Sequence, residues 1–388
     1  MKVLYITTMY PIPAFPQQGI FCHEQVKALK ELGVNVTVVV PIPFYDRQVK
    51  VSRWEYEGVQ VQYIRFFKVP GPGDFHKTGK ALYRQLNRKL DLSRFDVYHA
   101  DAALPSGQAA MYAAQKYKKP FLVHGHGLDM FLDRSYKDAK NCPMVVDACK
   151  QVYEKADGIV GVSRKVLDKV QARVDIADKD FVAFNGVDAE KFCPVEKASS
   201  EKVTFIAIGN LIPLKGHDYT LRAIKALVDK GHTNIRLQLL GRGYLEQELK
   251  DLAKELNIEQ YVEFVGYVPY DDVRKKLQQS DVFVLPSWYE AFGCVYLEAM
   301  ACGLPAIGCL GNGIDEVILH GQTGYLVENK SLEQLTDCME KLLDKPTRQR
   351  IGKAAAEAVT DRYLWKHSAE ALVQVYKICV EGGRKDGL

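Results

Sequence analysis

The chain alternates short apolar segments, rich in β-branched residues, with longer segments of helical periodicity. It opens with KVLYITTMYP, passes a loop that ends at Gly19, continues through a helical pattern, and returns to the apolar segment VNVTVVVP. A strand, a glycine-bearing loop, a helix and a second strand make a βαβ unit. Because this alternation continues along the chain, it predicts an α/β protein with mostly parallel, doubly wound sheets.

The alternation occurs in two runs, which a polar segment without periodicity separates. We expect a domain at 1–190, a linker at 191–201, a second domain at 202–360, and a C-terminal helix at 361–388 that packs back on the first domain. Open α/β sheets bind ligands at the carboxyl ends of their strands, so we expect the two Rossmann-like domains to face each other across a cleft. The expected strands lie in VQYIRF, DVYHA, PFLVHGH, GIVGVS and FVAFNGV, and then in KVTFIAIGN, IRLQLLGRG, YVEFVGYVP, DVFVLPS and LPAIGC.

Composition excludes several classes of protein. No apolar run has the length of a membrane span, and the first strand is too short for the core of a signal peptide, so we expect a cytoplasmic protein. The nine cysteines form no CxxC pair, which argues against a disulfide framework or a zinc site. The net charge is +6 through Glu201 and −2 beyond it, which suits an anionic ligand or surface on the first half but does not indicate nucleic acid.

The strongest local signal is the segment EAFGCVYLE, from Glu290 to Glu298. It follows an expected buried strand and runs into a helix, with Gly293 at the turn. Backbone N–H groups at a helix start suit an anion, and two carboxylates can bind the vicinal hydroxyls of a sugar and a ribose. The alternative is that Glu298 pairs with a neighbouring lysine and Glu290 only caps the helix.

A second signal is GNLIPLKG, a strand-to-helix turn that carries Lys215. A lysine at a helix N-terminus opposes the helix dipole unless an anion is also present, which points to a phosphate site. The alternative is a solvated surface lysine.

Two histidines, His124 and His126, end a buried strand and can donate to a ligand or shuttle a proton. A structural role is an equal alternative for His124 and a weaker one for His126, which Gly127 and Asp129 follow. Gly19 can approach a phosphate closely, although a lone glycine outside a GxGxxG pattern is weak evidence.

Residues 75–90 form a candidate amphipathic helix, with four basic residues along one face and leucines along another. Such a helix can lie on an anionic membrane surface. The alternative is an ordinary surface helix whose leucines belong to the core. The basic residues are Lys77, Lys80, Arg84 and Arg88, and the leucines are Leu82, Leu86 and Leu90.

Together these segments resemble the retaining GT-B glycosyltransferases of family 4, over nearly the whole chain. The most specific part is the EX7E motif from Glu290 to Glu298. Within the family, the chain looks most like bacterial surface-polysaccharide or teichuronic acid transferases. The supporting segments are GNLIPLKG, HGLD, GVSR, NGVD, FVGYVP and GNGIDEVILHGQTGYLV.

The resemblance implies the GT-B fold, a UDP- or GDP-sugar donor held mainly by the second domain, and a glycan or polyprenyl-linked acceptor held by the first. Lys215, Glu290 and His126 would act on the reacting sugar and diphosphate. Family enzymes need no metal. They need no cofactor either, since the nucleotide sugar is a substrate. The implied donor-binding residues are Gly19, Asn210, Lys215, Val265, Tyr267, Glu290, Phe292, Gly293, Cys294, Val295 and Glu298.

One position departs from the family. Asn210 stands where an arginine is usual, so a permanently charged clamp on phosphate is replaced by a neutral hydrogen-bonding group, and Arg242 is a candidate substitute. This departure is the argument for a non-catalytic sugar-nucleotide-binding protein on the same fold. A GT-B-fold sugar-nucleotide epimerase and a phosphorylase are two further alternatives. A nicotinamide dehydrogenase is disfavoured, because no GxGxxG follows the first strand.

Overall fold

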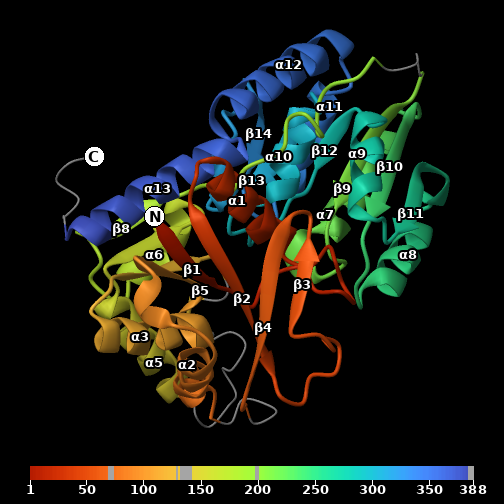
Figure 1. Ribbon diagram of the computed structural model, residues 1–388. Helices are drawn as coiled ribbons and strands as arrows, with labels where there is room; N and C mark the ends of the chain where they lie inside the picture. Colours follow the sequence, from red (N-terminus) through yellow and green to blue (C-terminus); the bar gives the residue numbers. More distant parts are fainter. Residues whose placement is uncertain (69–73, 128–129, 132–141, 197–200, 383–388) are drawn as a thin grey trace. The chain divides into compact units, whose positions relative to one another are not determined.

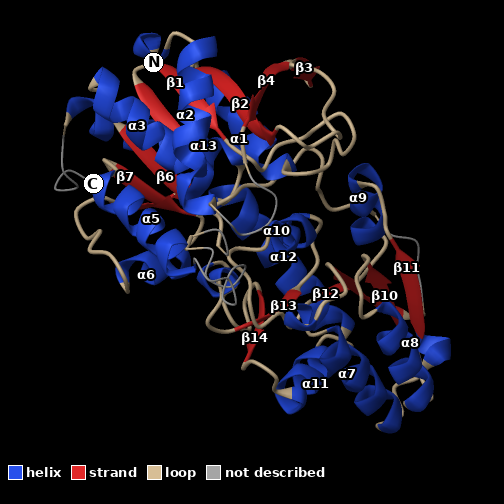
Figure 2. Ribbon diagram, turned by 90° about the horizontal axis from the view of Figure 1, so that it is seen from below, coloured by secondary structure: helices blue, strands red, loops and turns tan. Residues whose placement is uncertain are grey.

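The computed structural model describes residues 1–68, 74–127, 130–131, 142–196 and 201–382. It divides into two compact units, Met1–Asn185 with Trp365–Leu388, and Gly186–Leu364. Each unit is built around one sheet with helices on both of its faces (Figures 1 and 2). The expectation of two doubly wound α/β sheets is confirmed.

The first unit has an eight-stranded sheet in the order β3-β4-β2-β1-β5-β6-β7-β8. All neighbouring strands run parallel except β3, which pairs antiparallel with β4. The strand order reverses direction between β1 and β5, so the loops that leave these two strands open at the topological switch point, where open α/β sheets bind ligands. The strands are β1 Lys2–Ile6, β2 Asn35–Pro43, β3 Arg53–Tyr56, β4 Val59–Phe66, β5 Val97–Asp101, β6 Phe121–Gly125, β7 Gly158–Gly161 and β8 Asp180–Val182.

Helices cover both faces of this sheet. On one face, α1 and the C-terminal helix α13 pack together, and Leu29 and Leu372 join a buried cluster with Val97 of β5. The C-terminal helix therefore belongs to the first unit, although it follows the second unit in the sequence. The helices are α1 Ile20–Glu31, α2 Thr78–Lys89, α3 Gln108–Tyr117, α5 Cys142–Lys155, α6 Arg164–Gln171 and α13 Trp365–Glu381.

The second unit has a six-stranded, all-parallel sheet in the order β11-β10-β9-β12-β13-β14. Its switch point lies between β9 and β12. The strands are β9 Val203–Ile208, β10 Ile235–Leu240, β11 Val262–Gly266, β12 Val282–Val284, β13 Ala306–Cys309 and β14 Gly324–Val327. The helices are α7 His217–Asp229, α8 Glu246–Glu255, α9 Tyr270–Gln278, α10 Cys294–Ala301, α11 Leu332–Lys341 and α12 Lys345–Arg362.

The expected linker at 191–201 is wrong in its first part. Phe192 is buried, its N–H donates to the carbonyl oxygen of Asp188, and Gln278 donates to the carbonyl oxygen of Cys193. These contacts attach residues 186–196 to the second unit, while 197–200 lie outside the described residues. The expected domain end at 360 also shifts, because α12 continues to Arg362 and α13 begins at Trp365.

The amphipathic segment 75–90 forms a 3₁₀ turn, Phe75–Lys77, followed by α2. Leu82 and Leu86 are fully buried in the first unit, and Leu90 is half-buried. The apolar face is therefore part of the core and cannot insert into a bilayer, whereas Lys80, Arg84 and Arg88 are exposed. Among the described residues, no helix combines the length and the apolar character that crossing a membrane requires.

Candidate functional site

Two loops of the second unit meet at its switch point. The loop after β9 ends in the 3₁₀ turn Pro213–Lys215, and the loop after β12 carries Ser287 and Trp288. The carbonyl oxygen of Leu214 accepts from the Ser287 hydroxyl at 2.9 Å and from the Trp288 N–H at 3.1 Å. These bonds fix the first loop against the second, and they bring together two residues that the sequence analysis singled out.

These two residues are Lys215 and Glu290, which form an ion pair with 2.5 Å between Nζ and Oε2. Lys215 is therefore not a solvated surface lysine. Glu290 is held through its backbone, because its N–H donates to Oδ1 of Asn312 and its carbonyl oxygen accepts from the N–H of Gly313. The N-cap position of α10 is Gly293 and not Glu290, whose carboxylate is paired with Lys215.

Glycines allow the backbone to pass closely at both helix starts. Gly216 precedes α7 at φ 66°, and a Cβ there would lie 2.4 Å from the carbonyl oxygen of Pro286. Gly293 precedes α10 at φ 89°, and a Cβ there would lie 2.7 Å from the Tyr296 ring. His217 opens α7 as a neutral imidazole, because burial lowers its pKa to about 4. Both helices thus begin beside the Lys215–Glu290 pair, with N–H groups that can serve an anion.

Glu298 lies in α10 with only 8% of its surface exposed. Its Oε1 accepts a hydrogen bond from the Tyr270 hydroxyl at 3.0 Å. Burial raises its pKa to about 7, against the opposing effects of Tyr270 and of the positive charge on Lys191. Lys191 itself pairs with Asp271 and lies 4.7 Å above the Tyr270 ring. The expected alternative, direct pairing of Glu298 with a lysine, is not what the structure shows.

The remaining predicted residues of the second unit surround this centre. Asn210 is exposed, and its carbonyl oxygen lies 3.3 Å from Nε2 of His217. Arg242 is the candidate substitute for the missing arginine. Its guanidinium carbon lies 5.3 Å from the centroid of the exposed Tyr267 ring and stacks over that ring. Val265 is half-buried in β11. Phe292 is buried, and Cys294 and Val295 open α10 half-buried.

The first unit holds a second group of predicted residues at its own switch point. Gly19 adopts φ 64°, and a Cβ there would lie 2.3 Å from the carbonyl carbon of Met9, so the loop after β1 folds tightly against the start of α1. His126 follows β6, and its ring centroid lies 5.1 Å from that of Phe21 in α1. The neighbouring residues 128–129 of the HGLD segment lie outside the described residues.

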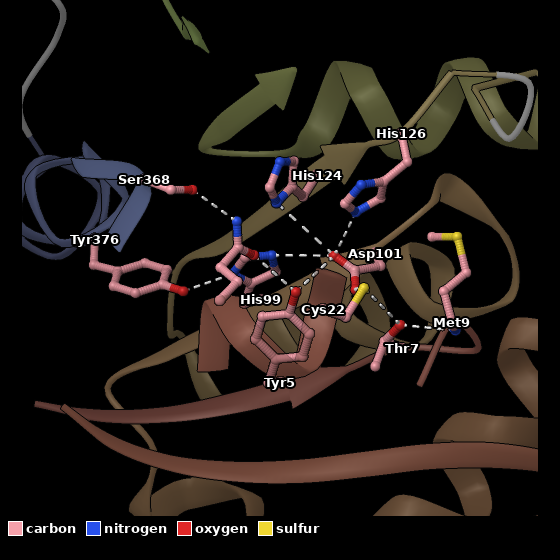
Figure 3. A network of polar contacts seen from close by, with 11 residues as sticks. Tyr5, Thr7, Met9, Cys22, His99, Asp101, His124, His126, Ser368 and Tyr376 are labelled. Carbon is pink, nitrogen blue, oxygen red and sulfur yellow. Dashed lines mark hydrogen bonds and ion pairs between the residues drawn. The ribbon is translucent and has the colours of Figure 1, made fainter. Parts of the chain in front are cut away.

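His126 belongs to a buried network that sequence reasoning missed (Figure 3). Its centre is Asp101, the last residue of β5, whose side chain is fully buried. Oδ1 accepts from the Tyr5 hydroxyl at 3.2 Å and lies 3.2 Å from Nε2 of His126, while Oδ2 accepts from the Cys22 thiol at 3.3 Å. His99 of the same strand places its Nε2 3.3 Å from Oδ1. We call Tyr5, Cys22, His99, Asp101, His124 and His126 the Asp101 cluster.

Two sets of three side chains in the described residues bring metal-ligating atoms within 4.8 Å of one another. They are Cys22 with Asp101 and His126, and Asp101 with His99 and His124. Both sets use Asp101, so an ion in either would replace the hydrogen bonds that this carboxylate accepts. The patterns HAD and HGH at the ends of two neighbouring strands are the sequence signal that could have found this cluster.

A cavity of about 1120 Å³ lies elsewhere in the second unit and includes none of the predicted residues. It is lined at the amino-terminal side of the sheet by residues such as Thr204 and Asp281, and around α12 by residues such as Arg348. Ligand sites of parallel sheets lie at the opposite edge, so the switch point and not this cavity is the candidate site of the second unit.

Comparison with known proteins identifies both parts of the chain. Residues 18–191 match the model described as Glycosyltransferase Family 4, and residues 188–358 match the model described as Glycosyl transferases group 1. A Bacillus subtilis protein named as the teichuronic acid biosynthesis glycosyltransferase TuaC is 25% identical, over 88% of this chain and 89% of its own length.

Solved structures show the same fold. Sucrose-phosphate synthase from Thermosynechococcus elongatus superposes with a TM-score of 0.80 at 18% identity, over 99% of this chain and 100% of that one. Anabaena HepE, solved in complex with UDP and glucose, superposes with a TM-score of 0.72 at 16% identity, over 97% of this chain and 99% of that one. The two family models and the name of the Bacillus subtilis relative favour a transferase over the epimerase, phosphorylase and binding-protein readings.

Proposed function

We propose that this chain, which belongs to the glycosyltransferases through its family 4 and group 1 domains, transfers a sugar from a nucleoside diphosphate sugar with retention of anomeric configuration. The acceptor is a glycan or a polyprenyl-linked glycan, and the context is bacterial cell-surface polysaccharide synthesis, for which the relative TuaC is named. UDP is the first choice of nucleotide, because the related HepE structure holds UDP. The observation that carries the proposal is the Lys215–Glu290 pair at the switch point of the second unit.

In this proposal the donor diphosphate meets Lys215 and the backbone N–H groups at the starts of α7 and α10. Negative charge builds on the β-phosphate as the bond to the anomeric carbon breaks, and fixed positive groups at that place lower the barrier. Glu290, released from Lys215, accepts hydrogen bonds from hydroxyl groups of the donor sugar together with the N–H groups of residues 292–295. The cation and the carboxylate are prepositioned by the same contact.

Glu298 binds the ribose hydroxyls, and the backbone of Val265 and Tyr267 flanks the base. A carboxylate accepts two hydroxyl hydrogen bonds at once, and burial strengthens such bonds by excluding water. Tyr270 already donates to one oxygen of Glu298, which orients the carboxyl group before the nucleotide arrives. Asn210 offers the diphosphate a neutral hydrogen bond at most.

The first unit supplies the acceptor side, with Gly19 near the phosphates and His126 at the transferred sugar. No strong protein base is needed, because the leaving phosphate takes the proton of the acceptor hydroxyl. The reaction uses no metal ion, since Lys215 and the helix N-termini supply the positive charge. The protein acts in the cytoplasm, where nucleotide sugars are made. Its exposed basic residues on α2 provide an electrostatic contact with the anionic inner face of the cell membrane.

Thermal unfolding with UDP, GDP, ADP, CMP and NAD in separate samples tests the donor class. A ligand at ten times its Kd adds about 1.4 kcal/mol, which corresponds to a shift of roughly a couple of degrees for domains of this size. We expect UDP to raise the melting temperature of the wild type but not that of the Lys215→Ala variant. A shift with NAD alone, or with no nucleoside diphosphate, would contradict the proposal.

A further inference from the structure

Asp101 carries a negative charge in a place where burial alone would neutralise it. Burial acts to raise its pKa, but the positive charge of His126 and the hydrogen bonds from His126 and His99 hold that pKa well below its usual range. Within the described part of the chain, no lysine or arginine pairs with this carboxylate. Its compensation therefore comes from the donors of the Asp101 cluster, and a buried carboxylate that lacks such donors is very costly.

An ionised carboxylate can only accept hydrogen bonds, and this fixes the ring proton of His126. Because Nε2 of His126 lies 3.2 Å from Oδ1 in hydrogen-bonding geometry, Nε2 must carry a proton. In the neutral ring, Nδ1 then holds the lone pair. The ring orientation is fixed as well, since the His126 side chain is only 8% exposed and lies against Phe21.

The carboxylate is itself held in place from the opposite side. Nδ1 of His99 lies 2.6 Å from the Tyr376 hydroxyl of α13, while Nε2 of the same ring faces Oδ1 of Asp101 at 3.3 Å (Figure 3). With the Tyr376 hydroxyl donating to Nδ1, the ring proton of His99 is on Nε2, the nitrogen that lies near the carboxylate. A chain of polar contacts thus runs from the C-terminal helix through His99 and Asp101 to His126.

The backbone beside Asp101 supports a functional role independently. Ala102, the next residue, adopts φ 68° and ψ 152°, a conformation that residues with a Cβ rarely adopt. Its N–H donates to the carbonyl oxygen of His124 at 2.9 Å, which ties the end of β5 to the strand that precedes His126. Strained residues of this kind cluster at active sites, where the surrounding structure enforces a required geometry.

We propose that Asp101 is the positioning residue of His126: its carboxylate fixes the orientation and the tautomer in which that ring meets the transferred sugar. The proposal rests on the proposed function only for the place where His126 acts. It assigns His99 and Tyr376 the task of holding Asp101, and it gives the C-terminal helix a part in the site of the first unit. A cluster that only fills the core would show no special dependence of His126 on Asp101.

The first test needs no substrate. The side-chain nitrogen resonances of the full-length wild type, labelled with ¹⁵N-histidine and assigned with a His126→Gln variant, report the tautomer of His126 directly. We expect a proton on Nε2 and a lone pair on Nδ1 in the neutral ring. A neutral His126 protonated on Nδ1 would overturn the proposal.

The second test uses variants and the hydrolysis of UDP-glucose, followed by UDP release. We expect Asp101→Asn to lower kcat about tenfold or more with little change in KM, as for other residues that orient a reacting imidazole. Asp101→Asn in the His126→Gln background should lower kcat no further, because Asp101 acts through His126. Tyr98→Phe is the matched control, since it removes a buried tyrosine hydroxyl of the same strand, whose hydrogen bond goes to the carbonyl oxygen of Leu92 and not to the Asp101 cluster, and it should leave kcat unchanged.

The outcomes separate this proposal from the proposed function. Independent, multiplying losses in the double variant, or an equal loss in Tyr98→Phe, would overturn the positioning role. Failure of the wild type to hydrolyse any donor would count against the proposed function. The histidine resonances of the wild type and of Asp101→Asn would still decide whether Asp101 sets the tautomer of His126. One equivalent of a transition metal in the purified wild type, lost in both Asp101→Asn and Cys22→Ser, would also overturn the proposal, because the carboxylate would then be a metal ligand.

Discussion

The ammonium group of Lys215 lies 2.5 Å from Oε2 of Glu290, so the two charges assigned to the donor are paired with each other across two loops. Both side chains are largely buried, with 19% and 16% of their surfaces exposed. Pairing lowers the desolvation cost of each charge at this largely buried position before a ligand binds. The pair is also easily exchanged, because a diphosphate can replace the carboxylate at Lys215 while sugar hydroxyls replace the ammonium at Glu290.

Replacing Lys215 by alanine should lower kcat for donor turnover about 10²- to 10³-fold, the range observed when one group that stabilises developing negative charge is removed. The measurement is UDP release at saturating donor. Lys225→Ala is the control, because it breaks an exposed lysine–aspartate pair on α7 and leaves the loops intact. Wild-type turnover by Lys215→Ala would remove the residue from the mechanism.

The stability of the second unit should fall as pH rises through neutrality, because of Glu298. Burial raises its pKa from 4.5 to about 7, so the folded state binds this proton more tightly than the unfolded state does. The resulting stabilisation is fully present below pH 4.5 and is lost as pH rises to about 7. The shift corresponds to roughly 3 kcal/mol in the free energy of unfolding.

Urea unfolding of the wild type and Glu298→Gln at pH 5 and pH 8 measures this contribution. The wild type should lose stability relative to the variant on going to pH 8. Glu333→Gln, a change at an exposed glutamate of α11, should leave the pH dependence of the wild type in place. A difference between wild type and Glu298→Gln that does not depend on pH would show that Glu298 titrates normally in the folded protein.

Gly216→Ala should destabilise the protein by several kcal/mol more than Gly231→Ala, although both glycines have positive φ and flank the same helix. A Cβ at Gly216 would lie 2.4 Å from the carbonyl oxygen of Pro286, whereas nothing lies within 4 Å of one at Gly231. Gly231→Ala therefore reports only the conformational penalty, about 1 kcal/mol. Urea midpoints of both variants at one pH give the comparison. Equal losses of stability would mean that the loops carrying Gly216 and Pro286 move apart with no loss in the free energy of unfolding.

The site of the second unit could be predicted from the sequence because each of its parts lies within one short segment. Lys215 follows β9 by a few residues and Glu290 follows β12 in the same way, and parallel strands bring their carboxyl ends to one edge. The pairing of the two charges could not be predicted. It depends on the hydrogen bonds to Leu214, which no residue pattern encodes.

The Asp101 cluster escaped prediction because its members come from β1, α1, β5 and the end of β6, which are far apart in the sequence. Asp101 also reads as the polar end of a strand, and a single buried aspartate leaves no periodic signal. The strands β3 and β14 were missed as well. That the leucines of 75–90 belong to the core could not be settled from the sequence, because periodicity defines an apolar face but not what covers it.

Removal of divalent metal ions should leave donor turnover unchanged. In the proposed mechanism the positive charge that meets the diphosphate belongs to Lys215 and to the N–H groups at the starts of α7 and α10, so no ion is required between phosphate and protein. The measurement is UDP release by protein dialysed against EDTA, with and without added Mg²⁺ or Mn²⁺. The Lys215→Ala variant makes the assay sharper, because an added ion could partly replace its missing cation and restore turnover in that variant alone. Loss of wild-type turnover on chelation, reversed by Mn²⁺, would instead show that an ion carries the charge assigned here to Lys215.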